Sequence, residues 1–120
     1  MAFAEKFEDL EIWQQAQDLA VRIYQLFGPD NASRLDFRFN GQIQSAAVSI
    51  SNNIAEGFDS GTTPEFARFL RISKRSCAEV RSMLHLAERL NYIDSVEAAT
   101  ERESAEVLSK RIAAFIRKLK

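Results

Sequence analysis

Cysteine, proline and glycine are scarce in this chain of 120 residues, and each shortage excludes a class of protein. The single cysteine, Cys77, excludes an intrachain disulfide and favours a reducing compartment. The two prolines and four glycines leave long segments free of helix breakers. No apolar run approaches the roughly 18 residues that cross a membrane, and the first residues lack the apolar region of a secretory signal. We therefore expect a cytoplasmic protein without a membrane partner.

Catalytic and metal-binding patterns are also missing. His85 is the only histidine, and the order His85-x-x-Glu88 occurs once, whereas a di-iron bundle site needs Glu-x-x-His on two helices. Cys77 falls on an apolar helix face, where it should behave as a small buried side chain. The chain has no glycine-rich phosphate loop, nucleophile elbow or zinc motif. We expect no enzyme activity, no metal, no cofactor and no small-molecule substrate.

Start and stop signals divide the chain into four helices, at about 9–27, 36–57, 63–90 and 95–118. Thr62 and Asp94 are predicted N-caps, with Pro64 in the first turn of the third helix. Gly57 is predicted to end the second helix in a left-handed conformation. Because short connections join long helices, the sequence predicts a single all-α domain over 1–120, an antiparallel up-down-up-down four-helix bundle.

Two of these helices carry more apolar surface than one bundle face needs. In helix 9–27, a stripe suited to the core consists of Leu10, Trp13, Ala20, Tyr24 and Phe27. A second stripe beside it consists of Ile12, Ala16, Leu19, Ile23 and Leu26. Helix 63–90 has a similar second stripe of Ile72, Met83, Leu86 and Leu90. A tightly wrapped core is one explanation, but extended apolar patches are rarely left in water. We therefore expect a homo-oligomer with contacts from Ile12, Leu19, Leu26, Ile72, Met83 and Leu86.

Helix 63–90 also carries a basic arc. The formal net charge of -1 excludes a globally basic protein but not a local basic face. Arg68, Arg71, Lys74 and Arg75 are the candidate phosphate contacts for RNA or DNA. A solvated face without a ligand is the alternative, and an ion pair between Arg68 and Glu56 across the helix pair is a further possibility.

Helix 36–57 is unusual for its many small and uncharged polar residues. An apolar stripe of Ile43, Ala47, Ile50 and Ile54 lies beside a polar stripe of Ser45, Ser49, Asn52, Asn53 and Glu56. Small side chains allow close packing, and amides can hydrogen-bond across a helix seam. A partner-binding surface is the other interpretation of this stripe.

The same stretch carries a family resemblance. The most recognisable segment of the 23S ribosomal RNA intervening sequence protein family resembles three parts of this stretch: Gln42-Ile43, residues 46–50 with Ser49, and Asn53-Ile54-Ala55-Glu56-Gly57. The opening Phe7, 9–14 and Ala16 is similar to the start of that family, as are Glu65-Phe66, Phe69-Leu70 and the corner at 90–93. The resemblance covers about residues 7–93.

The resemblance implies a bundle with a left-handed twist and a ring-shaped homopentamer. Relatives occur within ribosomal RNA insertions and as an accessory protein of diversity-generating retroelements, which suggests RNA or DNA as a partner. This chain departs from the family pattern at Gln44-Ser45, where two basic residues are typical. The leading hypothesis is a non-enzymatic, self-associating module that binds nucleic acid. The alternative is a structural or protein-interaction module with no nucleic-acid binding.

Overall fold

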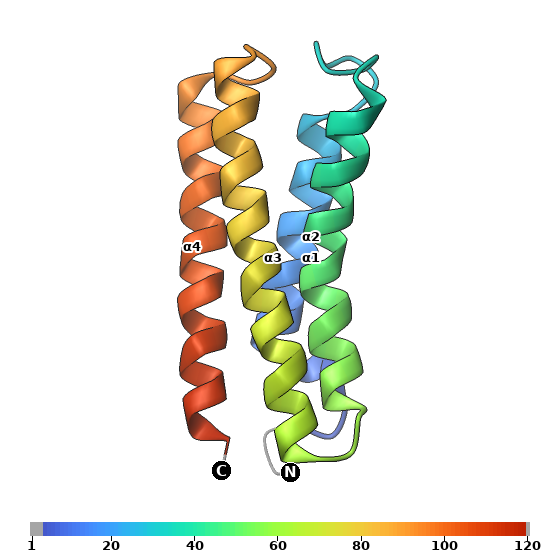
Figure 1. Cartoon of the computed structure of the whole chain (residues 1–120), viewed down its shortest axis with the longest axis vertical. Helices are drawn as coiled ribbons and strands as arrows, with labels where there is room; N and C mark the ends of the chain where they lie inside the picture. Colours follow the sequence, from blue (N-terminus) through green and yellow to red (C-terminus); the bar gives the residue numbers. More distant parts are fainter. Residues whose placement is uncertain (1–3, 120) are drawn as a thin grey trace.

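The structure, a computed structural model, describes residues 4–119 and forms a slender four-helix bundle measuring 44 × 20 × 19 Å (Figure 1). After a short 3-10 turn, η1 (Phe7–Asp9), come the helices α1 (Glu11–Leu26), α2 (Phe37–Phe58), α3 (Thr63–Arg89) and α4 (Ser95–Lys118). Residues 1–3 and 120, at the two ends of the expected domain, lie outside the described residues. The expected four-helix bundle is confirmed, and the handedness of its twist stays a prediction.

Helices α2, α3 and α4 begin where side chains satisfy their first backbone N–H groups. Thr62 accepts a hydrogen bond from the Glu65 backbone, and Asp94 forms a complete capping box with Glu97. At the end of α3, Asn91 adopts a left-handed conformation with φ of 61°, which asparagine tolerates better than most residues. The predicted caps at Thr62 and Asp94 are therefore confirmed.

The chain direction reverses at each connection in Figure 1, and helices that are consecutive in sequence lie side by side. α1 packs against α2 and α4, and α3 also packs against α2 and α4, but the described residues show no α1–α3 or α2–α4 packing. The outer face between α1 and α2 therefore lies on the opposite side of the bundle from the outer face between α3 and α4.

The second apolar stripe of α1 belongs to the protein's own core. Ile12, Ala16, Leu19 and Ile23 are each 5% exposed or less, whereas Tyr24 of the first stripe is 48% exposed. Because α1 lies between α2 and α4, it must cover a broad arc toward both neighbours. The prediction that Ile12 and Leu19 contact a second copy is corrected, because intrachain packing leaves them almost no free surface.

Aromatic contacts mark the two ends of this core. The ring of Phe39 lies 5.2 Å from both Phe27 and Tyr92, joining α2 to the two connections at one end. At the other end, the ring of Phe66 lies 5.9 Å from Phe58 and 5.6 Å from Phe115. The first cluster ties α2 to both connections at its end, and the second joins α2, α3 and α4.

Gly57 has a different role from the one its sequence position suggests. It does not have positive φ, and α2 continues through it to Phe58, so the predicted left-handed helix end at Gly57 is wrong. A Cβ atom there would lie 2.7 Å from Phe69 Cβ and 3.0 Å from Phe66 Cδ1. Glycine is needed at this position because α2 and α3 approach each other too closely for a side chain.

Replacing Gly57 with alanine should destabilise the bundle, although alanine favours a helix by about 1 kcal/mol over glycine. The added methyl group would overlap Phe69, and overpacking of this kind costs roughly 1–3 kcal/mol. Urea denaturation measures the net loss. The control is Gly41→Ala in the same helix, where no atom lies within 4 Å of the added Cβ, and stability should rise. Equal effects of the two substitutions would contradict the close approach.

A hydrogen-bond network joins the connection between α1 and α2 to the corner between α3 and α4. Asp36 caps α2 by accepting from the Phe39 backbone, and the Tyr92 hydroxyl donates to the same carboxylate at 2.6 Å. The Asn31 amide donates to the Tyr92 carbonyl oxygen at 2.7 Å. The hydrogen bond from Tyr92 is the main reason that the pKa of Asp36 lies below its ordinary value.

The substitution Tyr92→Phe should raise the pKa of Asp36, measurable by NMR titration of its carboxyl group. The native bond favours the charged carboxylate, so its stabilisation is present at neutral pH and is lost as pH falls through the lowered pKa. The difference in melting temperature between the two proteins should therefore shrink in acid. A difference that stays constant from neutral pH to about pH 2 would show that Tyr92 acts through packing alone.

Candidate nucleic-acid interface

All four basic residues proposed from the sequence line one groove between α3 and α4. This basic groove has a volume of about 520 Å³ and is lined by Arg68, Arg71, Lys74, Arg75, Ala78 and Ser109. The helical spacing of the four cations places them along one side of α3. The structure adds one residue from α4, Ser109, which sequence reasoning missed because it carries no charge and belongs to no recognisable motif.

Arg68 is already engaged within the chain. Its Nε and Nη2 atoms donate to the two carboxylate oxygens of Glu65 at 3.0 and 3.1 Å, and its guanidinium lies 4.6 Å from the centre of the Phe69 ring. This pairing lowers the pKa of Glu65 and raises that of Arg68. Arg68 therefore pairs with Glu65 rather than with Glu56, and the i,i+3 spacing of the pair could have predicted this.

The other three cations of the basic groove are uncompensated. Arg71 and Arg75 are exposed and Lys74 is half-buried, and none of them has an ion pair or side-chain hydrogen bond with another described residue. Three other arginines are instead neutralised across a helix pair. Arg22 pairs with Glu101, Arg81 with Glu106 and Arg102 with Glu88. The positive charge of these three groove residues therefore takes part in no ion pair within the described residues.

The register of α4 against α3 explains this difference. The first half of α4 is acidic, and its Glu106 meets Arg81 in the second half of α3. The second half of α4 is basic, and it runs beside the first half of α3, as the contact of Phe115 with Phe66 shows. The basic groove therefore lies beyond the acidic half of α4, and the α4 residue that lines it, Ser109, is uncharged, so no acid of α4 offsets its positive charge.

The family-motif residues of α2 mostly build the seam with α3. Ser49 accepts from the Ser76 hydroxyl at 2.9 Å, and the Asn53 amide donates to the Ser49 carbonyl at 2.8 Å. Gln42 reaches Glu79 at 3.4 Å, while Glu56 is exposed. No buried side-chain nitrogen or oxygen among residues 4–119 lacks a hydrogen bond. The network is complete, which favours the packing interpretation of this stretch.

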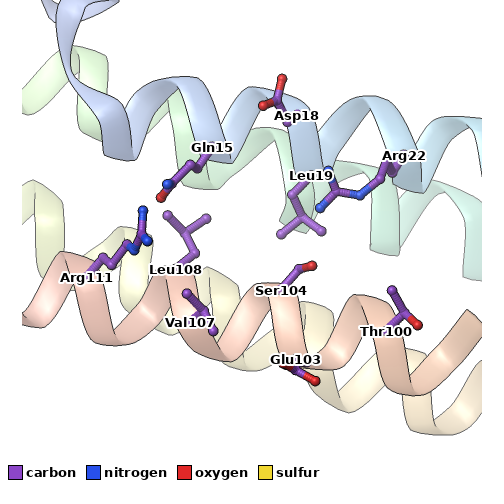
Figure 2. A pocket seen from close by; sticks show the side chains of 10 residues that line it. All are labelled: Gln15, Asp18, Leu19, Arg22, Thr100, Glu103, Ser104, Val107, Leu108 and Arg111. Carbon is purple, nitrogen blue, oxygen red and sulfur yellow. The ribbon is translucent and has the colours of Figure 1, made fainter.

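A second groove lies between α1 and α4, with a volume of about 360 Å³ (Figure 2). Figure 2 shows Leu19 and Leu108 pointing between the two helices. Both signs of charge lie along its walls, from Asp18, Arg22, Glu103 and Arg111. At one end Arg22 Nε donates to both carboxylate oxygens of the buried Glu101, at 3.0 and 3.1 Å. These charges do not converge on one point where a substrate could be held.

The remaining predicted interface residues differ in exposure. Met83 is only 8% exposed and, like Ile12 and Leu19, is covered by the protein's own core, so its prediction is corrected. Leu26 and Ile72 are half-buried, and Leu86 is 46% exposed. Only these last three keep surface for contact with a second copy.

Groups that could perform chemistry are few. Burial raises the pKa of the Cys77 thiol to about 12, so the reactive thiolate is disfavoured. His85 is exposed on α3. Within residues 4–119, no group of three His, Cys, Asp or Glu side chains could hold a metal ion. In the same part of the chain, no helix is long and apolar enough to cross a membrane.

Known proteins support the fold. A solved structure of a protein of unknown function, from the S23 ribosomal protein family of Bacteroides thetaiotaomicron VPI-5482, is similar with a TM-score of 0.80. The two chains are 22% identical, and the similarity covers 89% of this chain and 99% of that one, which shows a shared fold. No curated protein matches.

The sequence profile described as 23S rRNA-intervening sequence protein matches residues 8–114. The match includes all of α1, α2 and α3 and most of α4, as well as the serine-rich seam and the basic groove. The chain therefore belongs to the 23S rRNA-intervening sequence protein family.

Proposed function

We propose that this protein is a non-enzymatic, self-associating helical module that binds the phosphate backbone of RNA or DNA through the basic groove. The observation that carries the proposal is that Arg71, Lys74 and Arg75 line one groove without an acidic partner. Phosphate contacts require cations that are not already paired with an acid of the protein.

The shape of the basic groove suits a nucleic-acid strand better than a small anion. Arg71 and Arg75 are four residues apart, which corresponds to a rise of about 6 Å along α3. The positive charge is therefore extended rather than focused on one point. Such a row offers contacts to successive phosphates but carries no means of reading bases, so binding should depend on charge and shape.

The family context supports this proposal, because the description of the family refers to an intervening sequence of 23S rRNA. The basic pair that is typical after Gln-Ile in this family is replaced here by Gln44 and Ser45 on α2. In this chain three cations without an acidic partner lie together on α3 instead. Each protomer offers few contacts, and self-association would multiply them into avid binding.

A second candidate, a protein-interaction module, is favoured by apolar residues at one end of the bundle. Leu35 and Phe37 are 75% and 76% exposed, and Val96 is 72% exposed. They flank the two connections that the bond between Tyr92 and Asp36 joins. A specific protein partner recovered with the intact protein, together with no affinity for nucleic acid, would favour this candidate.

The triple variant Arg71→Glu, Lys74→Glu, Arg75→Glu should lose at least about tenfold in affinity for structured RNA and duplex DNA, measured by fluorescence anisotropy. For the wild type, three phosphate contacts predict a slope of log affinity against log salt of roughly -2 to -3 per protomer. For the variant, the slope should approach zero. Circular dichroism verifies that the variant folds.

The matched control is Arg34→Glu, Arg38→Glu, Arg89→Glu, which makes the same change in net charge with exposed residues toward the other end of the bundle. This control should keep most of the affinity. Equal losses in the two variants would mean that total charge, and not the basic groove, attracts nucleic acid. No binding by the wild type at low salt would reject the nucleic-acid proposal.

Neutralising Glu65 tests whether its pairing restrains Arg68. In the variant Glu65→Gln the guanidinium loses its charged partner, so affinity should rise by about two- to fivefold, as expected from the strength of an exposed ion pair. The salt dependence should also steepen, because a fourth cation becomes free. Glu103→Gln removes the same charge in the α1–α4 groove and should have a smaller effect. Equal gains would indicate a long-range effect of net charge alone.

A further inference from the structure

The basic groove contains unfilled space as well as positive charge. The two lining residues that carry no charge, Ala78 on α3 and Ser109 on α4, also have the smallest side chains of the set. Ala78 is exposed and Ser109 is half-buried, and the Ser109 hydroxyl makes no hydrogen bond with another described residue. Because neither helix fills the space between them here, the groove reaches about 520 Å³, a volume typical of sites that hold an organic ligand.

An ion pair crosses from α3 to α4 beyond one end of the basic groove. Arg81 follows Ala78 by three residues on α3, and Glu106 precedes Ser109 by three residues on α4. The two charged side chains meet at 3.5 Å, about one helical turn beyond the two small ones. The carboxylate of Glu106 repels phosphate at that end, so phosphates are attracted instead to the part of the groove that carries the unpaired cations.

The cations of the basic groove offer more than charge. An arginine has a planar guanidinium group that stacks on the face of an aromatic ring, and long basic side chains have apolar stems. The same helix already shows such a contact, since the Arg68 guanidinium lies 4.6 Å from the centre of the Phe69 ring. Arg71 and Arg75 have no aromatic partner of this kind among the described residues. They can therefore hold the flat ring of a ligand beside Ala78.

A double helix would use only part of this groove. Its bases are paired and stacked inside, so its backbone presents phosphates and sugars to a protein surface. Phosphates of a duplex can meet the cations, but they leave the space beside Ala78 and Ser109 unfilled. In a single strand or a loop, a base can turn outward and stack on an arginine or aromatic side chain while its phosphates stay on cations.

We infer that the basic groove is a site for an unpaired nucleotide, whose base lies against Ala78 and Ser109 while the neighbouring phosphates contact the three unpaired cations. The inference rests on the nucleic-acid binding in the proposed function and names the state of the strand that the groove prefers. The Ser109 hydroxyl can donate to or accept from the base or the sugar. Every base has a face that stacks, so the preference is for unpaired strands and not for one sequence.

Fluorescence anisotropy of the wild-type protein with three forms of one DNA strand tests this inference at a fixed salt concentration. The forms are a labelled, unstructured single strand of about 12 nucleotides, the same strand annealed to its complement, and a strand of that length with abasic sites at its centre. The intact single strand should bind at least about fivefold more tightly than the other two, because each stacked base contributes that much or more. The abasic strand keeps every phosphate, so it separates base contacts from attraction by charge.

The variant Ala78→Leu tests the position of the base, because it fills the space and leaves every cation in place. Ala78 is exposed, so the larger side chain needs no rearrangement of the core. The variant should lose at least about fivefold in affinity for the single strand and keep the wild-type affinity for the duplex. The matched control is Ala99→Leu, the same change at an exposed alanine of α4 that does not line the basic groove. This control should bind all three forms as the wild type does, and circular dichroism verifies that both variants keep their helices.

The outcomes separate this inference from the proposal on which it rests. A wild type that binds the duplex or the abasic strand as tightly as the intact single strand would overturn the inference and leave phosphate binding by the basic groove standing. Equal affinities of Ala78→Leu and Ala99→Leu for the single strand would overturn it as well. A wild type that binds none of the three forms at low salt would overturn both the inference and the nucleic-acid proposal.

Discussion

The close packing of α2 against α3 is the constraint on which the rest of the structure depends. Gly57 lets the backbone of α2 approach Phe66 and Phe69, and the Ser73 hydroxyl donates to the Ile50 carbonyl at 2.9 Å in the same seam. Small residues and internal hydrogen bonds fix how α3 is rotated about its own axis. That rotation directs the apolar side of α3 into the core and its arginines outward. The basic groove is thus a consequence of a seam that contains no basic residue.

Electrostatics then divides the surface of the bundle. α4 runs antiparallel to α3, so its acidic first half neutralises the second half of α3, through pairs such as Arg81 with Glu106. The second half of α4 is basic, so it does not neutralise any cation of the basic groove. The polarity of α4 also complements the helix dipole, with acids near its start and cations near its end. One charge pattern therefore stabilises the helix and concentrates positive potential on one region of α3.

The two sides of the bundle differ in chemistry as a result. On the α3–α4 side, the basic groove carries three cations without acidic partners, whereas the α1–α2 side carries amides, hydroxyls and exposed apolar groups. The core of a protein interface excludes unpaired charge. A phosphate contact instead requires a cation that is not already paired with an acid.

The sequence by itself determined the helix number, the caps at Thr62 and Asp94, the family and the arc that carries Arg68, Arg71, Lys74 and Arg75. These features follow from periodicity and from contacts within three or four residues of the chain. Only the tertiary structure decided that most of both stripes of α1 enter the core, why Gly57 is a glycine, and which cations remain unpaired. Those outcomes depend on neighbouring helices that are distant in sequence, because burial and ion pairing are set by what encloses a side chain. Ile12 and Leu19 are in the core, and Val21 and Tyr24 are on the surface, because α1 lies between α2 and α4.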